Sequence, residues 1–274
     1  MESLGEILPT DLKRFLTTEA LSDEEYLNFK LDCELKRVGT LNAEDNYNCD
    51  ICLNRGYIPK IYDGDIVYDR CKCMKVRKSI RILKASGLEG SIKKLSDFQI
   101  TEKWQADIKT RAYEFIVDNE ASCFYLGGQT GAGKTHICSG IAREYIKQGY
   151  DTRYIMWVDM IERMKDYRDS GRERYIEDIN AAKVLYIDDF FKPDKNNPSY
   201  NRTDIINTFK VIDKRYKAND KITLISSELL IRELSAVDEA TAGRIIEMSK
   251  GIYGIDIPKN EGRNYRLRAV RNCE

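Results

Sequence analysis

The feature that most constrains this chain is a glycine-rich loop of the form G-x-x-x-x-G-K-T, which runs from Gly128 to Thr135. The loop directly follows the apolar stretch Cys123–Leu126 and precedes a stretch of helical character. A strand, this loop and a helix in that order are typical of a nucleoside triphosphate site. Glycines let the backbone N–H groups surround a phosphate, and the helix directs its positive end at the same anion. The alternatives are a chance match or a decayed loop on a structural domain.

Each position of the loop has an expected part in binding ATP. Lys134 should reach the β- and γ-phosphate oxygens, and the Thr135 hydroxyl should ligate Mg²⁺. His136, the only histidine, follows the loop directly; we count it among the nucleotide-binding positions, expect it to pack on the helix and assign it no catalytic role. The other nucleotide-binding positions in the loop are Gly128, Thr130, Gly131, Ala132 and Gly133.

Two adjacent carboxylates, Asp188 and Asp189, follow the apolar run Val184–Ile187. Asp188 is the candidate that holds the magnesium ion through water, and Asp189 the candidate that polarises the attacking water. Most ATPases with this arrangement carry Asp-Glu, so the shorter Asp189 side chain predicts slow turnover. Two exposed loop acids are the alternative, but the run before them is too apolar for a surface loop.

Strand-like and helix-like stretches alternate from about residue 95 onward. The strand-like runs are Cys123–Leu126, Thr152–Met156, Val184–Ile187 and Ile222–Ser226. Alternation of this kind predicts an α/β fold with a parallel sheet flanked by helices on both faces.

Four of the eight cysteines, Cys49, Cys52, Cys71 and Cys73, have the spacing C-x2-C-x18-C-x-C. Between the pairs, two β-like runs flank the turn signal Asp63-Gly64, so a hairpin would bring the pairs together. A chain that stays in the cytoplasm keeps its thiols reduced, which favours a structural Zn²⁺ site over disulfides. Buried free thiols, or a site that borrows a carboxylate, are the alternatives.

The whole chain is neutral, with 45 basic and 45 acidic residues, which argues against a uniformly basic nucleic-acid binder. Between residues 70 and 94, however, nine basic residues stand against one acidic residue. Val76, Ile80 and Leu83 predict a short helix there, with one buried stripe and a cationic remainder. That cationic face is a candidate surface for single-stranded DNA, and a solvated helix face is the alternative. The nine are Arg70, Lys72, Lys75, Arg77, Lys78, Arg81, Lys84, Lys93 and Lys94.

The expected organisation has three parts. Residues 1–45 have loosely helical spacing, 46–94 form the zinc-binding hairpin and a basic linker helix, and 95–274 form the ATPase domain. No apolar run is long enough to span a bilayer, and the acidic N-terminal residues do not resemble a secretory signal, so a cytoplasmic location without membrane contact is expected.

Taken together, these motifs resemble those of DnaC/DnaI-type helicase loaders of bacteria and bacteriophages, which belong to the AAA+ ATPases. The cysteine segment is similar to that of the DnaI branch. The similarity covers roughly residues 46–270 and rests, beside the loop and Asp188-Asp189, on Gly56-Tyr57-Ile58, Trp157-Val158-Asp159, Ser226-Ser227-Glu228, Gly243–Glu247 and Gly262-x-Asn264-Tyr265-Arg266.

The resemblance implies further site residues and partners. Ser226 or Ser227 would be a polar sensor of the γ-phosphate, although Glu228 departs from the family, and Arg244 would be an arginine finger supplied to a neighbouring subunit. A helix residue that keeps its surface soluble is the alternative for Arg244. Arg266 would be a second sensor, with a half-exposed edge strand as the alternative.

The implied partners are a DnaB-type replicative helicase, single-stranded DNA and other copies of the ATPase domain. A transposition-helper ATPase of the IstB type, or an adaptor that binds nucleotide with negligible hydrolysis, are the rival functions.

Overall fold

The computed structural model describes residues 22–84, 93–166, 169–192, 200–218, 220–260 and 263–265. The chain divides into two compact units between residues 74 and 75. The helical spacing expected around Leu12, Phe15 and Leu16 lies outside the described residues. Among the described helices, none is long and apolar enough to cross a membrane.

Among the described residues, the first unit contains two helices and a two-stranded hairpin. Helix α3 begins after Ser22, whose side chain accepts from the Glu25 N–H while the Glu25 carboxylate accepts from the Ser22 N–H. The hairpin turns at Asp63 and Gly64, both with positive φ, as the turn signal predicts. The bounds are α3 (Asp23–Lys36), α4 (Asn42–Asp45), β1 (Tyr57–Tyr62) and β2 (Asp65–Arg70), and α3 packs against the hairpin.

Helix α5 (Cys73–Leu83) crosses the division between the units, and from Lys75 onward it belongs to the second. The Ser79 hydroxyl donates to the Tyr150 carbonyl at 3.0 Å and accepts from the Thr152 N–H at 3.2 Å. The helix therefore docks on the second unit, whereas the sequence pattern groups it with the cysteine segment. Its buried stripe also differs from expectation, because Arg77 is fully buried and so is not part of a cationic surface.

A five-stranded parallel sheet forms the centre of the second unit. The strand order is β4-β5-β6-β3-β7, which places the strand before the glycine-rich loop between β6 and β7. The bounds are β3 (Cys123–Gly128), β4 (Thr152–Met156), β5 (Val184–Phe190), β6 (Ile222–Ser227) and β7 (Gly254–Ile257).

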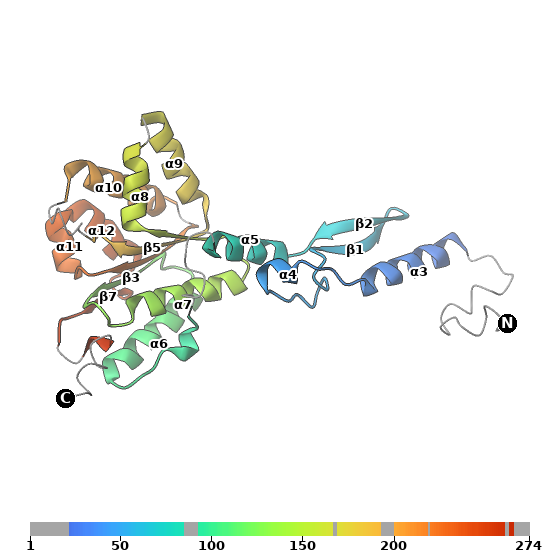
Figure 1. Cartoon of the computed structure of the whole chain (residues 1–274), viewed down its shortest axis with the longest axis horizontal. Coiled ribbons are helices and arrows are strands. Elements are labelled where there is room, and N and C mark those ends of the chain that lie inside the picture. Colours follow the sequence, from blue (N-terminus) through green and yellow to red (C-terminus); the bar gives the residue numbers. More distant parts are fainter. Residues whose placement is uncertain are drawn as a thin grey trace. The chain divides into compact units, whose positions relative to one another are not determined.

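Helices cover both faces of this sheet. Helix α7 packs on β3, β4, β5 and β6, with α6 against it, while α8 to α12 occupy the opposite face (Figure 1). The latter face buries an apolar cluster that includes Trp157, Phe190 and Phe191. The bounds are η3 (Leu95–Asp97), α6 (Lys103–Val117), α7 (Lys134–Lys147), α8 (Trp157–Asp166), α9 (Asp169–Ala181), α10 (Arg202–Tyr216), α11 (Ile231–Val237) and α12 (Glu239–Met248).

The α/β fold class is confirmed, because a five-stranded parallel sheet is flanked by helices on both faces. All four expected strands are present, and β4 has the predicted bounds. Strand β7 was not expected. Gly254 and Asp256 interrupt its apolar character, and within the described sheet it pairs with β3 alone.

Candidate nucleotide and metal sites

The glycine-rich loop needs its glycines for both backbone conformation and space. Gly128, Gly131 and Gly133 have φ values of 112°, 75° and 87°. A Cβ at Gly128 would overlap the Ile257 carbonyl oxygen, and one at Gly133 would lie 2.7 Å from a ring carbon of Phe98. Side chains at these positions are therefore excluded, and the loop backbone stays free to surround an anion.

Lys134 is held at the mouth of this loop. Its side chain is largely buried, and Nζ donates to the carbonyls of Gly128 at 2.8 Å and Gln129 at 2.9 Å. Burial lowers the pKa of Lys134, while the charges of Glu228, Asp189 and Asp188 act in the opposite direction. Within the described part of the chain, the ammonium group thus faces a cluster of carboxylates without an ion pair to any of them, as a phosphate-binding lysine requires.

Asp188 is buried and its carboxylate is fixed by four neighbours. Oδ1 accepts from the Thr135 hydroxyl at 3.3 Å, from the Asp189 N–H at 3.0 Å and from the Ser226 hydroxyl. Oδ2 accepts from the Tyr154 hydroxyl at 3.4 Å. Burial and the adjacent Asp188 charge raise the pKa of Tyr154, so that this group stays a donor. The hydroxyl and carboxylate expected to hold magnesium therefore lie together.

Asp189 sits at an irregularity of β5. The pairing of β5 with β6 shifts between Ile187 and Phe190, and Asp189 has a φ of 51°. Its Oδ2 lies 2.8 Å from Lys192 Nζ, and the same ammonium lies 3.6 Å from Glu228 Oε1. Sequence reasoning missed Lys192 as a site residue, because a lysine after an apolar run has the ordinary pattern of a surface side chain.

The two serines at the end of β6 point to different partners. The Ser226 hydroxyl donates to Asp188. The Ser227 hydroxyl instead donates to the Phe190 carbonyl at 2.7 Å and accepts from the Leu229 N–H at 3.1 Å. Of the two serines, Ser226 therefore contacts the carboxylate cluster, and a nucleotide-binding role of Ser227 stays a prediction.

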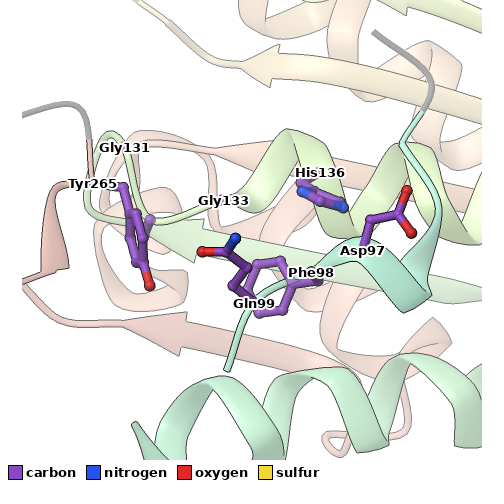
Figure 2. Close-up of a pocket in the computed structure, with 8 residues that line it drawn as sticks. Asp97, Phe98, Gln99, Gly131, Gly133, His136 and Tyr265 are labelled. Carbon is purple, nitrogen blue, oxygen red and sulfur yellow. The ribbon is translucent and has the colours of Figure 1, made fainter. Parts of the chain in front are cut away.

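A cavity of about 250 Å³ opens beside the loop (Figure 2). Phe98 packs edge-on against His136, and Nε2 of His136 lies 2.9 Å from the Lys94 carbonyl oxygen. Tyr265 is fixed by its N–H, which donates to the Gly131 carbonyl at 3.1 Å. The lining residues come from three separate parts of the chain: Asp97, Phe98, Gln99, Gly131, Ala132, Gly133, His136 and Tyr265.

This cavity has the apolar walls and polar rim that suit a nucleobase next to a phosphate loop. It brings His136 and Ala132 to one surface, whereas Thr130 is exposed outside it. Phe98 and Gln99 were missed by sequence reasoning, because no motif marks them and only the fold brings them to the loop.

Arg244 makes its described contacts within its own chain. Nε donates to Asp213 Oδ1 at 2.8 Å, and the guanidinium carbon lies 4.4 Å from the Phe209 ring centre and 5.5 Å from that of Tyr216. These contacts join α12 to α10, and the arginine-finger role of Arg244 stays a prediction. Arg266 lies outside the described residues.

The first unit brings together Cys49, Cys52, Cys71 and Cys73 as buried thiols that form no disulfide, and their sulfurs all lie within 4.8 Å of one another. The Cys49–Cys71 and Cys52–Cys73 sulfur pairs are 3.8 and 3.5 Å apart. A tetrahedral zinc ion with Zn–S bonds of about 2.3 Å places its sulfurs about 3.8 Å apart, so the set fits zinc.

The electrostatics of this cluster also favour a metal ligand. Burial acts to raise the pKa of Cys52, but hydrogen bonds from the Gly56 N–H and the neighbouring thiols outweigh it and lower the pKa to about 7. Burial raises the pKa of Cys71. A thiolate at Cys52 would be the first ligand available to a cation.

Comparisons with known proteins agree with this picture. The model of a family described as IstB-like ATP binding protein matches residues 65–268. Phage-like element PBSX protein XkdC of Bacillus subtilis is 31% identical over 242 residues, which cover 82% of this chain and 88% of that protein.

An insertion sequence IS5376 putative ATP-binding protein of Geobacillus stearothermophilus is 27% identical over 57% of this chain and 59% of its own length. Among solved structures, that of DnaI has a TM-score of 0.49 and 19% identity, covering 61% of this chain and 90% of that one.

Proposed function

This chain belongs to the family of IstB-like ATP-binding proteins, and from that premise we propose that it is an ATP-hydrolysing loader of a replicative helicase. It would bind a DnaB-type helicase and single-stranded DNA in the cytoplasm during the initiation of replication. The observation that supports ATP binding best is the convergence of Lys134, Thr135 and Asp188 at the mouth of the glycine-rich loop.

Each group of residues in the site has its own proposed role. The loop N–H groups and Lys134 bind the phosphates, and the Phe98, His136 and Tyr265 cavity takes the base. Thr135 and Asp188 would hold Mg²⁺, which neutralises the charge that develops on the transferred phosphoryl group. Asp189 would orient the attacking water.

The four cysteines would hold a structural zinc ion that stabilises the hairpin. The hairpin brings the second pair of thiols back to the first, and the exposed hydrophobic side chains of this unit, among them Ile51, Tyr62 and Tyr68, offer a surface to a protein partner. The first unit is thus the proposed contact with the helicase.

A transposition-helper ATPase is the second candidate, because proteins of insertion sequences share the ATPase core. They match only 57% of this chain, whereas the phage-element relative matches 82% of it. An alignment over 82% of the chain is longer than the second unit, residues 75–274. That alignment must therefore extend into the cysteine-bearing unit, as the family model also does from residue 65. The cysteine cluster itself favours the loader, because it resembles the segment of the DnaI branch.

The proposal is tested by measuring phosphate release from ATP with and without single-stranded DNA and the host's replicative helicase. A loader should hydrolyse ATP, respond to DNA and retain the helicase in a pull-down. The Lys134→Ala protein should lose both nucleotide binding and hydrolysis. Stable ATP binding without measurable phosphate release under any condition would instead identify a nucleotide-switched adaptor.

A further inference from the structure

We propose that Lys192 moves from Asp189 and Glu228 to the γ-phosphate when ATP binds, so that the nucleotide itself frees Asp189. This inference rests on the proposed ATPase function and names how its site would be regulated. The ion pair between Lys192 and Asp189 then keeps hydrolysis switched off until a triphosphate is in place.

The backbone holds Lys192 over Asp189. The Lys192 N–H donates to the Asp189 carbonyl at 3.0 Å and closes a turn. Phe190 and Phe191 within this turn are buried, and the Phe191 carbonyl accepts from the Tyr200 hydroxyl at 2.7 Å. Because this turn is anchored, the lysine side chain is directed back to the carboxylate, although 41% of it stays exposed to solvent.

Lys192 also belongs to the charge cluster of the phosphate site. It bridges Asp189 on β5 and Glu228, which follows the neighbouring strand β6. The charges of Glu228 and Asp189 are the strongest of those acting on Lys134. The Asp189 N–H also donates to Asp188 at 3.0 Å, and Asp188 accepts from Thr135 of the loop at 3.3 Å. A phosphate bound in the loop would therefore lie near the acids that Lys192 bridges.

The charges favour an exchange of partners. The hydrogen bond to Asp189 and the two acidic charges raise the pKa of Lys192 against the effect of burial, so that it is a firm cation. A γ-phosphate adds negative charge next to this cation and competes with Asp189 for it, whereas ADP carries no such group. Discrimination between ATP and ADP is thus the property that Lys192 should control.

Equilibrium binding of ADP and of a non-hydrolysable ATP analogue to the full chain, with Mg²⁺, tests this role. In the Lys192→Met protein the affinity for the analogue should fall roughly tenfold or more, as for one charge-assisted hydrogen bond, while ADP binding stays the same. Lys192→Arg should keep the discrimination. Lys147→Met is the matched control, because Lys147 forms an exposed i, i+3 ion pair with Glu144 at the far end of α7.

A double-mutant cycle distinguishes an exchange from simple electrostatics. Asp189→Asn should tighten binding of the ATP analogue relative to ADP, and this gain should be larger with Lys192 present than with Met in its place. Equal gains in both backgrounds, or an unchanged ratio of ATP-analogue to ADP affinity in Lys192→Met, would overturn the inference. Failure of the unmodified protein to bind either nucleotide would contradict the proposed function itself.

Discussion

At the scale of single residues, Ser226 and Ser227 show how neighbours of identical chemistry serve different ends. Both are buried at the end of β6. Because side chains alternate along a strand, the first faces Asp188 and the second faces the backbone of Phe190 and Leu229. One hydroxyl therefore orients a site carboxylate, and the other satisfies buried backbone groups.

Substitution of each serine by alanine should separate these roles. Ser226→Ala removes a donor that orients Asp188, so Mg²⁺-dependent hydrolysis should fall about tenfold or more. Some stability should also be lost, because the Ser226 hydroxyl lies 3.1 Å from the buried Tyr186 hydroxyl. Ser227→Ala leaves the buried Phe190 carbonyl and the partly buried Leu229 N–H without their partner and should cost about 1–3 kcal/mol of unfolding free energy. The first effect is measured as the rate of ATP hydrolysis against Mg²⁺ concentration, and the second by urea unfolding. If the two variants behave alike, the two serines do not have the separate roles assigned to them.

At the scale of elements, the sequence pattern predicts the cysteine hairpin well and the buried face of α5 poorly. The hairpin follows from a two-residue turn and two β-like runs, all local signals. Helix α5 also forms where expected, but its buried side includes Arg77 and Ser79, because it packs on the polar backbone around Tyr150. The surface left for a ligand is therefore smaller than a count of basic residues suggests.

Removal of zinc should disorder the cysteine hairpin and leave the ATPase core folded. Metal-binding free energy is folding free energy in a module of this size, so chelation should remove the amide protection of β1 and β2 alone. Hydrogen exchange and metal analysis provide the measurements. Cys71→Ser should reproduce the effect, and Cys33→Ser, at an exposed cysteine outside the cluster, should not. A zinc content far below one per chain would contradict the assignment.

The exposed cations of α5 should contribute to DNA binding through ion pairs with phosphates. Replacement of Lys75, Lys78 and Arg81 by Glu should weaken the binding of single-stranded DNA. The slope of log affinity against log salt concentration should become shallower by about 0.7 for each phosphate that is no longer neutralised. Affinity is measured against salt concentration for two unrelated sequences, which should behave alike.

A charge-matched control for this experiment carries Glu at Lys36, Lys60 and Lys147, exposed lysines on other elements. If both triple variants bind DNA like the unmodified protein, α5 is not the DNA surface. Arg77 is excluded from the set, since its substitution would disturb packing instead.

At the scale of the whole molecule, hydrolysis is expected to need two subunits, with Arg244 of one completing the site of the next. An arginine finger contributes about 10³–10⁵ in rate, so the Arg244→Ala protein should keep its nucleotide affinity and be nearly inactive. The Lys134→Ala protein should also be nearly inactive, because it binds nucleotide poorly. Mixed together, the two variants should recover part of the activity, measured as phosphate release per chain.

The contacts of Arg244 with Asp213 and Phe209 define the opposing outcome. If these contacts are its whole function, Arg244→Ala should unfold at lower temperature, hydrolyse ATP normally when folded, and show no recovery on mixing in a sample shown to co-assemble. Activity per chain that does not rise with protein concentration would count against the need for two subunits in the same way.

The sequence by itself determined those features of the protein that arise from residues close together in the chain. The G-x-x-x-x-G-K-T loop, the four apolar strands and the capping box at Ser22 all use residues a few positions apart, so their signals survive without a fold. The pairing of Thr135 with Asp188 was also foreseeable, because both follow parallel strands whose ends meet at one edge of the sheet.

Only the tertiary structure decided which distant segments contact one another, because nothing in the local pattern of one segment indicates its partner. Phe98 and Tyr265 line one cavity beside the loop, Arg77 is buried by packing, and β7 pairs with the edge of β3. Lys192 faces Asp189 because buried aromatic rings fix the intervening turn. Such contacts depend on which surfaces the fold brings together, and that is set by the packing of the whole unit.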